Sequence, residues 1–114
     1  MYQYKKENNF KYRVNESTKI LDKYPNKIPL IIEKSKNCIY YINKNKYLLP
    51  KDIKVYQLNF IIRKRLNINK SDALFIYINN IIPPSNNLIS DIYEDFKDKD
   101  GFLYITYSNE NTFG

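Results

Sequence analysis

The hydrophobic positions near the start of the chain recur at helical spacing. Residues 9–24 predict a helix, and Asn9 is a suitable N-cap residue for it. The residues that fall on one face of this helix are Phe10, Val14, Ser17 and Leu21. A shorter helical turn is expected near residues 2–8. Pro25 and Pro29 then prevent the helix from continuing.

The middle of the chain predicts two short strands and a second amphipathic helix. Residues 28–34 (IPLIIEK) are rich in β-branched side chains, and residues 46–50 (KYLLP) form a second apolar run that a proline ends. The intervening segment 35–45 is polar and turn-like apart from residues 39–42. Residues 54–67 favour a helix, because their apolar side chains repeat at helical spacing. These side chains are Val55, Leu58, Ile62 and Leu66.

The last third of the chain predicts a strand, a helix and a strand. Residues 74–79 (LFIYIN) form a nearly continuous apolar run, which is typical of a strand buried on both faces. Residues 88–96 predict a short helix that Ser85 or Asn87 is placed to cap, and residues 102–107 (FLYITY) predict the last strand. After the two N-terminal helices, the order ββαβαβ is that of an α+β ubiquitin-like β-grasp. Ferredoxin-like variants stay open on element order alone.

Composition and charge narrow the class of protein. A chain of 114 residues with 43% hydrophobic residues predicts one folded domain rather than a disordered chain. Its net charge of +7 favours acidic partners: nucleic acid, anionic lipid or acidic peptides. A single cysteine, Cys38, excludes an internal disulfide and fits a reducing compartment. Because no apolar run approaches the length of a membrane span, we expect a soluble intracellular domain.

The residues of this chain give little support for a catalytic site or a metal-binding site. The chain has no histidine, so Cys38 lacks an imidazole partner and is interpreted as a loop thiol without a catalytic role. Asp98 and Asp100 match positions of an EF-hand loop, but Phe96 and Tyr107 then occupy positions that must ligate calcium, and neither can. We therefore expect no enzyme activity, no cofactor and no metal site.

A basic run leaves a second function class open. Arg63, Lys64 and Arg65 follow one another on the predicted helix 54–67, and Tyr56 and Phe60 precede them. Basic side chains with aromatic neighbours are typical of nucleic-acid interfaces. A solvated helix face or a protein contact explains the same pattern, so a basic nucleic-acid-binding module is the alternative interpretation.

Several segments together resemble one family. They are KYPNKIPLIIEK (23–34), KYLLP (46–50), FIIRKRLNI (60–68), NNIIPPSNN (79–87) and DGFLYITYSNENTFG (100–114). In order and spacing they are similar to the autophagy ubiquitin-like modifiers, which include the GABA-receptor-associated proteins and the microtubule-associated-protein light chains. The resemblance implies a β-grasp with a four-stranded mixed sheet and two extra N-terminal helices. Its expected parts are a helical extension (1–23), a core (24–107) and a flexible conjugation tail (108–114). The asparagine- and lysine-rich composition and the terminal glycine indicate a protist member.

The resemblance also implies that this chain is the substrate of a conjugation reaction. E1-like and E2-like enzymes would join Gly114 to phosphatidylethanolamine, and a deconjugating cysteine protease would reverse the step. The expected locations are the cytoplasm and the autophagosome membrane, with the outer membrane of a relict plastid as an alternative. Whether the gene ends at Gly114 or a longer precursor is cleaved stays open. Nucleic acid is not an expected partner on this interpretation.

A second implied activity is the binding of cargo receptors and adaptors through short aromatic-x-x-aliphatic motifs flanked by acids. The peptide would add as a strand beside residues 46–50. The residues implied for the aromatic pocket are Glu16, Ile20, Pro29, Ile31, Lys46, Leu48 and Phe102. Those implied for the aliphatic pocket are Tyr47, Leu49, Pro50, Ile53, Leu58, Ile61 and Arg65. The flanking acids would meet Lys27, Lys44 and Lys46.

The sequence departs from the family pattern at several positions. The segment between Lys34 and Lys46 is one residue shorter than in animal members and unusually apolar (NCIYYI). Lys27 stands where arginine is common, and Leu58 stands where an aromatic residue is frequent. These changes put the contacts of the loop and the shape of the aliphatic pocket in question.

Overall fold

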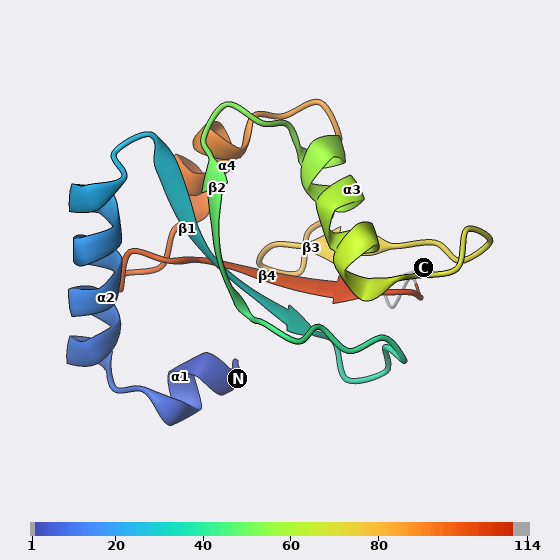
Figure 1. The fold of residues 1–114 in the computed structure, drawn as a ribbon, viewed down its shortest axis with the longest axis horizontal. Coiled ribbons are helices and arrows are strands. Elements are labelled where there is room, and N and C mark those ends of the chain that lie inside the picture. The colour runs from blue at the N-terminus through green and yellow to red at the C-terminus, as the bar shows by residue number, and fades with distance from the viewer. Residues whose placement is uncertain (1, 111–114) are drawn as a thin grey trace.

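The computed structural model describes residues 2–110 of the chain and contains all eight expected elements (Figure 1). They are α1 (Gln3–Glu7), α2 (Phe10–Lys23), β1 (Lys27–Lys34), β2 (Lys46–Pro50), α3 (Val55–Leu66), β3 (Phe75–Tyr77), α4 (Ile89–Phe96) and β4 (Leu103–Ser108). β3 is shorter than the predicted strand 74–79. β4 extends one residue beyond the predicted end, so Ser108 belongs to the sheet and not to the expected tail.

The strands form one mixed sheet in the order β2-β1-β4-β3. β1 and β4 run parallel in its centre, while β2 and β3 pair antiparallel at the two edges. Figure 1 shows α3 on one side of the sheet and α1 and α2 on the other. This is the β-grasp arrangement with two additional N-terminal helices, as the element order predicted.

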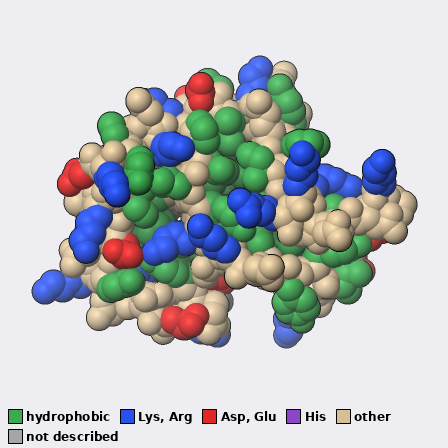
Figure 2. Space-filling model, viewed as in Figure 1, with side chains coloured by type: hydrophobic (Ala, Val, Ile, Leu, Met, Phe, Trp, Pro, Cys, Tyr) green, Lys and Arg blue, Asp and Glu red, His purple; other side chains and the backbone are tan. Residues whose placement is uncertain are grey.

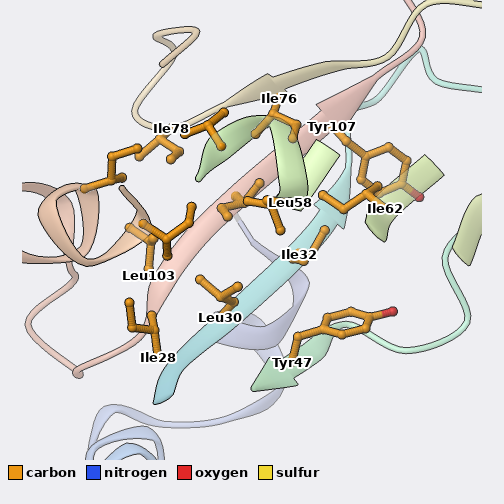
Figure 3. Packing of buried hydrophobic residues seen from close by; sticks show 14 of the residues in the cluster. Ile28, Leu30, Ile32, Tyr47, Leu58, Ile62, Ile76, Ile78, Leu103 and Tyr107 are labelled. Atoms are coloured by element: carbon orange, nitrogen blue, oxygen red, sulfur yellow. The ribbon is translucent and has the colours of Figure 1, made fainter. Parts of the chain in front are cut away.

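The main core lies between the sheet and α3 (Figure 3). Side chains alternate between the two faces of a strand, and on β1 Leu30 and Ile32 point into this core. Leu58 and Ile62 of α3 pack against them, and all four side chains are almost completely buried. The predicted apolar stripe of α3 is therefore confirmed. Side chains from α4 and β3 complete the cluster.

A second, smaller core holds the N-terminal helices against the opposite face of the sheet. Ile31, Phe102 and Tyr104 point to this side, and Tyr4 of α1 packs on them with its ring edge toward Phe102 at a centroid distance of 5.4 Å. Tyr2 adds a ring contact with Tyr104 at 4.8 Å. Because side chains alternate between the two faces of β1 and β4, these strands contribute residues to both cores.

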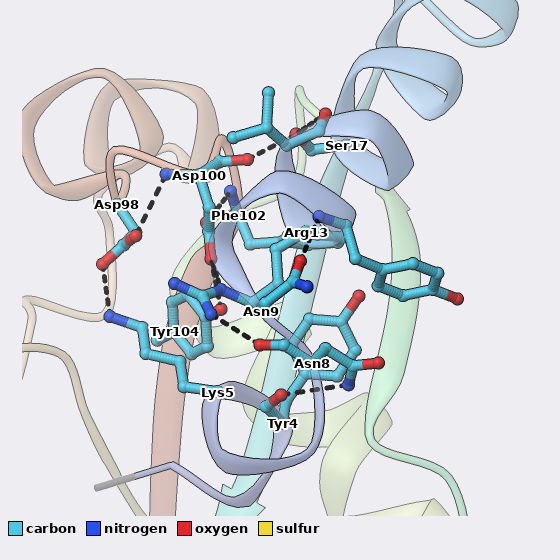
Figure 4. A network of polar contacts seen from close by, with 12 residues as sticks. Tyr4, Lys5, Asn8, Asn9, Arg13, Ser17, Asp98, Asp100, Phe102 and Tyr104 are labelled. Carbon is cyan, nitrogen blue, oxygen red and sulfur yellow. Dashed lines mark hydrogen bonds and ion pairs between the residues drawn. The ribbon is translucent and has the colours of Figure 1, made fainter.

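A buried ion pair joins α2 to the turn before β4 (Figure 4). Arg13 Nε donates to Asp100 Oδ2 at 2.7 Å, and the Asp100 side chain is completely buried. The same oxygen accepts from the Tyr104 hydroxyl at 2.5 Å, while Asp100 Oδ1 accepts from the Phe102 backbone N–H at 2.9 Å. Burial, followed by the bond to Asp100, raises the pKa of Tyr104. The acidic run that failed as a calcium loop is therefore the attachment point of α2.

The buried face of α2 differs from the expected apolar stripe. Arg13 and Ser17 are its buried residues, whereas Phe10 is half exposed, with the Arg13 guanidinium over its ring at 5.6 Å. The Ser17 hydroxyl donates to the Asp100 carbonyl oxygen at 2.5 Å. The helix docks through polar groups because the turn before β4 offers it a carboxylate and a carbonyl.

Gly101 follows this turn with a φ of +91°, a backbone conformation that favours glycine. A Cβ atom at this position would overlap the Ser17 hydroxyl. The absence of a side chain at Gly101 therefore permits the close contact between α2 and the turn.

The predicted helix caps are confirmed at α2 and wrong at α4. Asn9 Oδ1 accepts from the Tyr12 backbone N–H at 2.8 Å. The N-cap of α4 is Leu88, which makes no side-chain capping bond. Ser85 and Asn87 instead offer their backbone carbonyls to the first N–H groups of α3, at 3.0 Å each.

In the described residues 2–110, every helix is too short or too polar to cross a membrane.

Candidate functional site

Strand β2 lies at the edge of the sheet and divides the candidate residues between its two faces. Lys46 and Leu48 lie opposite Ile31 and Pro29 of β1, so these four side chains share the face that carries α2. Tyr47, between Lys46 and Leu48, joins the main core on the α3 face. The residues expected for two separate pockets are thus placed on opposite sides of one exposed strand.

The set expected to hold an aromatic side chain lies between β2 and α2, and we call it the α2-side site. It comprises Glu16, Ile20, Pro29, Ile31, Lys46, Leu48 and Phe102. Ile31 and Phe102 are completely buried, so they form its floor. Ile20 and Leu48 are partly exposed and flank that floor. The structure brings residues from four separate segments of the chain together here.

An ion pair spans the α2-side site. Lys46 Nζ donates to Glu16 Oε1 at 3.1 Å, and both side chains are partly exposed. This hydrogen bond lowers the pKa of Glu16, with a smaller opposing contribution from burial. Lys46 Nζ also lies 5.8 Å from the centre of the Tyr4 ring. The pair links α2 to the edge strand and places one charge of each sign at the site.

The set expected to hold an aliphatic side chain lies between β2 and α3, and we call it the α3-side site. It comprises Tyr47, Leu49, Pro50, Ile53, Leu58, Ile61 and Arg65. Leu58 is completely buried and Tyr47 nearly so, whereas Leu49, Ile53 and Ile61 are partly exposed. The Arg65 guanidinium lies over the Tyr47 ring at 5.9 Å from its centre. Leu58 therefore shapes the floor, and the three partly exposed aliphatic side chains offer the contact surface.

An apolar pocket of about 480 Å³ extends this surface along α3. Its lining residues are Ile53, Tyr56, Gln57, Phe60 and Ile61. Tyr56, Gln57 and Phe60 are absent from the set that the sequence predicted. Tyr56 and Phe60 stand four residues apart on a helix, so they share a face. That spacing is the signal that indicates an apolar patch here.

The three lysines expected to meet flanking acids are divided between two ends of β2. Lys44 and Lys46 lie at its start, where Lys44 Nζ stands 5.9 Å from the centre of the Tyr47 ring. Lys27 pairs with Pro50 at the other end of the strand. Lys46 and Pro50 are four positions apart along the strand, which is about 13 Å. A bound strand would therefore meet positive charge near both of its ends.

The three residues of the basic run contact different neighbours. Arg63 donates to the carbonyl oxygens of Asp72 and Asn69, at 2.9 and 3.3 Å. Lys64 lies over the Phe60 ring at 4.7 Å, and Arg65 lies over Tyr47. Arg63 thus holds the loop after α3, so part of its guanidinium is occupied by hydrogen bonds within the protein.

Cys38 is buried in the main core, and its sulfur lies 3.8 Å from the Tyr40 carbonyl oxygen. It packs as a small apolar side chain. Gly114, the expected conjugation site, lies outside the described residues 2–110. The last described part of the chain follows β4, where the Glu110 backbone N–H donates to Ser108 Oγ at 3.1 Å.

Sequence comparison identifies relatives over nearly the full chain. A family model described as autophagy protein Atg8, ubiquitin-like, matches residues 12–114. Autophagy-related protein 8e of Arabidopsis thaliana is 49% identical over 112 residues, covering 97% of this chain and 92% of the relative. Autophagy-related protein 8 of Schizosaccharomyces pombe is 50% identical over 113 residues, covering 98% and 93%.

Solved structures agree with this chain in fold. The crystal structure of Trypanosoma brucei ATG8 superposes with a TM-score of 0.93 at 37% identity, covering 100% of this chain and 99% of the other. Plasmodium falciparum Atg8, solved in complex with a peptide of Plasmodium falciparum Atg3, gives a TM-score of 0.89 at 36% identity, covering 97% and 98%. The mixed sheet and both N-terminal helices are therefore shared with solved relatives.

Proposed function

This chain belongs to the ubiquitin-like Atg8 family of autophagy proteins, and we propose that it is a modifier attached through Gly114 to phosphatidylethanolamine. The observation that supports this most is that the family match continues to Gly114 itself. We keep the expected division into a helical extension (1–23), a core (24–107) and a conjugation tail (108–114) as part of this proposal, except that Ser108 lies in β4 and belongs with the core.

The proposed reaction needs an accessible carboxylate. An E1-like enzyme adenylates the Gly114 carboxylate with release of pyrophosphate, and a cysteine thiolate then displaces AMP to form a thioester. After transfer to an E2-like enzyme, the lipid amine attacks the thioester carbonyl, forms an amide and releases the thiol. Each step brings a nucleophile to the same carbonyl carbon, and a residue without a Cβ leaves that approach unhindered. A deconjugating cysteine protease would hydrolyse the amide.

Attachment to phosphatidylethanolamine explains how a chain without a spanning helix in its described residues would stay on a membrane. Each buried methylene contributes about 0.8 kcal/mol, and two acyl chains give stable anchoring where one does not. We propose that the protein is cytoplasmic before conjugation and lies on the autophagosome membrane afterwards. The relict plastid alternative gains no support from the relatives compared above.

The conjugation test uses the full chain. It is incubated with E1-like and E2-like enzymes, ATP and vesicles that contain phosphatidylethanolamine. We expect a product whose mass equals protein plus lipid minus one water, and whose fragment spectrum places the lipid on Gly114. If the enzyme thioester forms and no lipid adduct follows, the proposed lipid target is wrong.

We propose in addition that β2 and its two flanking sites bind short peptides. An extended peptide would pair with the edge strand, placing alternate side chains into the α2-side and α3-side sites. Plasmodium falciparum Atg8 was solved in complex with a peptide of Plasmodium falciparum Atg3. That complex supports the proposal that the present chain also binds peptides. The lysines at both ends of β2 favour a peptide with acidic flanks. A strand with two anchors typically binds with micromolar affinity, about −8 kcal/mol.

Ile61→Asp is expected to weaken peptide binding by about tenfold or more, because it places a charge against an apolar anchor. Binding is measured by fluorescence anisotropy of a labelled peptide with an aromatic-x-x-aliphatic motif and acidic flanks. Ile81→Asp is the control, since Ile81 is exposed in the turn after β3. Equal affinities for both variants, with unchanged thermal unfolding, would exclude the α3-side site as the anchor.

A further inference from the structure

The loop between β1 and β2, residues 35–45, presents the two most exposed large hydrophobic side chains of the described residues. Ile39 is 67% exposed and Tyr41 is 77% exposed. A pair of such side chains two positions apart in an extended segment points to one side. Exposed apolar side chains that lie together indicate a contact surface rather than chance.

The loop holds this pair in a fixed position. Cys38, Tyr40 and Ile42 alternate with the exposed pair and turn inward, where Cys38 and Ile42 join the main core. The Tyr40 hydroxyl bonds to Asp72, and its carbonyl oxygen accepts from the Tyr107 hydroxyl at 2.8 Å. Ile39 and Tyr41 thus project from a segment that is bonded to the body of the protein on its inner side.

The charge around the exposed pair is positive. Residues 34–45 include Lys34, Lys36 and Lys44 and contain no acidic residue. Lys34 Nζ lies over the Tyr41 ring at 5.1 Å from its centre. Two carboxylates near the loop accept hydrogen bonds: Glu33 from the backbone N–H groups of Gln3 and Tyr4, and Asp72 from the Tyr40 hydroxyl. Figure 2 shows Lys and Arg side chains distributed over the whole of this face.

The loop lies beside the end of β4, from which the chain continues to Gly114 (Figure 1). Lys34 pairs with Tyr107, and the Ser35 backbone N–H donates to the Tyr107 carbonyl oxygen at 2.9 Å. Farther along, the Ile39 backbone N–H donates to Asn109 Oδ1 at 3.4 Å. Four residues from Glu110 to Gly114 span at most about 14 Å. A lipid joined to Gly114 would therefore hold its membrane within a short reach of this loop.

We propose that the loop 35–45 contacts an anionic lipid surface, with Ile39 and Tyr41 in the interfacial layer and the loop lysines at the headgroups. Tyrosine favours that layer, and basic residues near a membrane are attracted to anionic lipids. The inference rests on the proposed conjugation at Gly114, and it adds a membrane-facing side to the attached protein. We take the occupant to be a lipid surface rather than a peptide, because residues 34–45 carry three lysines and no acidic residue and lie beside the segment that leads to Gly114.

Depth of insertion is the first test. Tyr41→Cys is made in a Cys38→Ala background, labelled with the environment-sensitive dye NBD, and conjugated to vesicles of phosphatidylcholine, phosphatidylethanolamine and phosphatidylserine. Tyr12→Cys in the same background is the control, because Tyr12 is an exposed tyrosine on α2. We expect the label at position 41 to brighten on conjugation and to be quenched by spin-labelled lipids, and the label at position 12 to show neither change. Conjugated protein with equal quenching at both positions would overturn the inference while conjugation stands.

A second test does not depend on conjugation. The unconjugated chain is mixed with phosphatidylserine-containing vesicles, and the bound fraction is measured by flotation. Ile39→Ser with Tyr41→Ser is expected to reduce binding on the order of tenfold, since both apolar side chains leave the interface. The matched control is Ile81→Ser with Ile82→Ser, which removes two exposed apolar side chains from the turn after β3. An equal loss in both double variants, or none in either, would contradict the loop contact. Binding of the labelled loop to a second copy of the chain in the absence of lipid would also overturn it.

Discussion

Replacing Asp100 by asparagine is expected to lower the free energy of unfolding by about 3–5 kcal/mol, because breaking one side of a buried ion pair leaves the other charge uncompensated. Arg13 would keep its charge while losing its carboxylate partner, and Tyr104 would lose the acceptor of its hydroxyl. Both partners are largely buried, so water replaces the lost bonds poorly. The N-terminal helices would detach first, since this pair joins α2 to the sheet.

The measurement is urea unfolding followed by circular dichroism, with Asp98→Asn as the control. Asp98 pairs with Lys5 at 2.6 Å, and about a quarter of each side chain remains exposed. A partly solvated pair of this kind is typically worth about 1 kcal/mol or less. Asp100→Asn should therefore shift the midpoint several times farther than Asp98→Asn. Similar shifts for the two variants would show that the Asp100 network contributes no more than a surface pair.

Gly114→Ala is expected to slow conjugation by about 10²-fold, since a small displacement of reacting atoms costs a rate factor of that order. A methyl group next to the carbonyl obstructs adenylation, both thioester exchanges and the final attack by the lipid amine. The rate is measured as lipid adduct formed per unit time with saturating enzymes. Asn111→Ala is the control, because it changes the tail without altering the reacting residue. If Gly114→Ala is lipidated as fast as the unaltered chain, Gly114 is not the acyl group that is transferred.

The secondary structure was predictable where an element has a clear local pattern of apolar residues. The helical spacing of apolar residues, among them Leu58 and Ile62, predicted α3. A run of β-branched residues predicted β1, and apolar runs predicted β2, β3 and β4. The ends of β3 and β4 were less well defined, since pairing between Phe75 and Ser108 depends on partners 33 positions apart in sequence. Helix capping at α4 was mispredicted for a similar reason: the carbonyls near Ser85 and Asn87 bond to α3.

The attachment of α2 could not be predicted from local pattern. Arg13 belongs to the polar positions of its helix, and Asp100 stands in an acidic run that fits a solvated helix end equally well. Only the folded chain shows that these two residues, 87 positions apart, form a buried pair. The composition of both candidate sites came from resemblance to a family, because residues from α2, β1, β2, α3 and the segment just before β4 meet there. Tyr56 and Phe60 were named only as aromatic neighbours of the basic run, although their spacing of four residues on one helix is a signal for the apolar surface that they form along α3.

The docking of α2 and the occupation of the α2-side site share two residues, Glu16 and Ile20. Their equilibria are therefore linked: a peptide that needs α2 in place stabilises the docked helix, and a loosened helix lowers the peptide's apparent affinity. At a peptide concentration 100 times its Kd, the linkage amounts to about 2.7 kcal/mol. If β2 binds peptides as proposed, the buried contact between Ser17 and Asp100 would therefore raise the apparent affinity for a peptide at an edge strand that this contact does not touch.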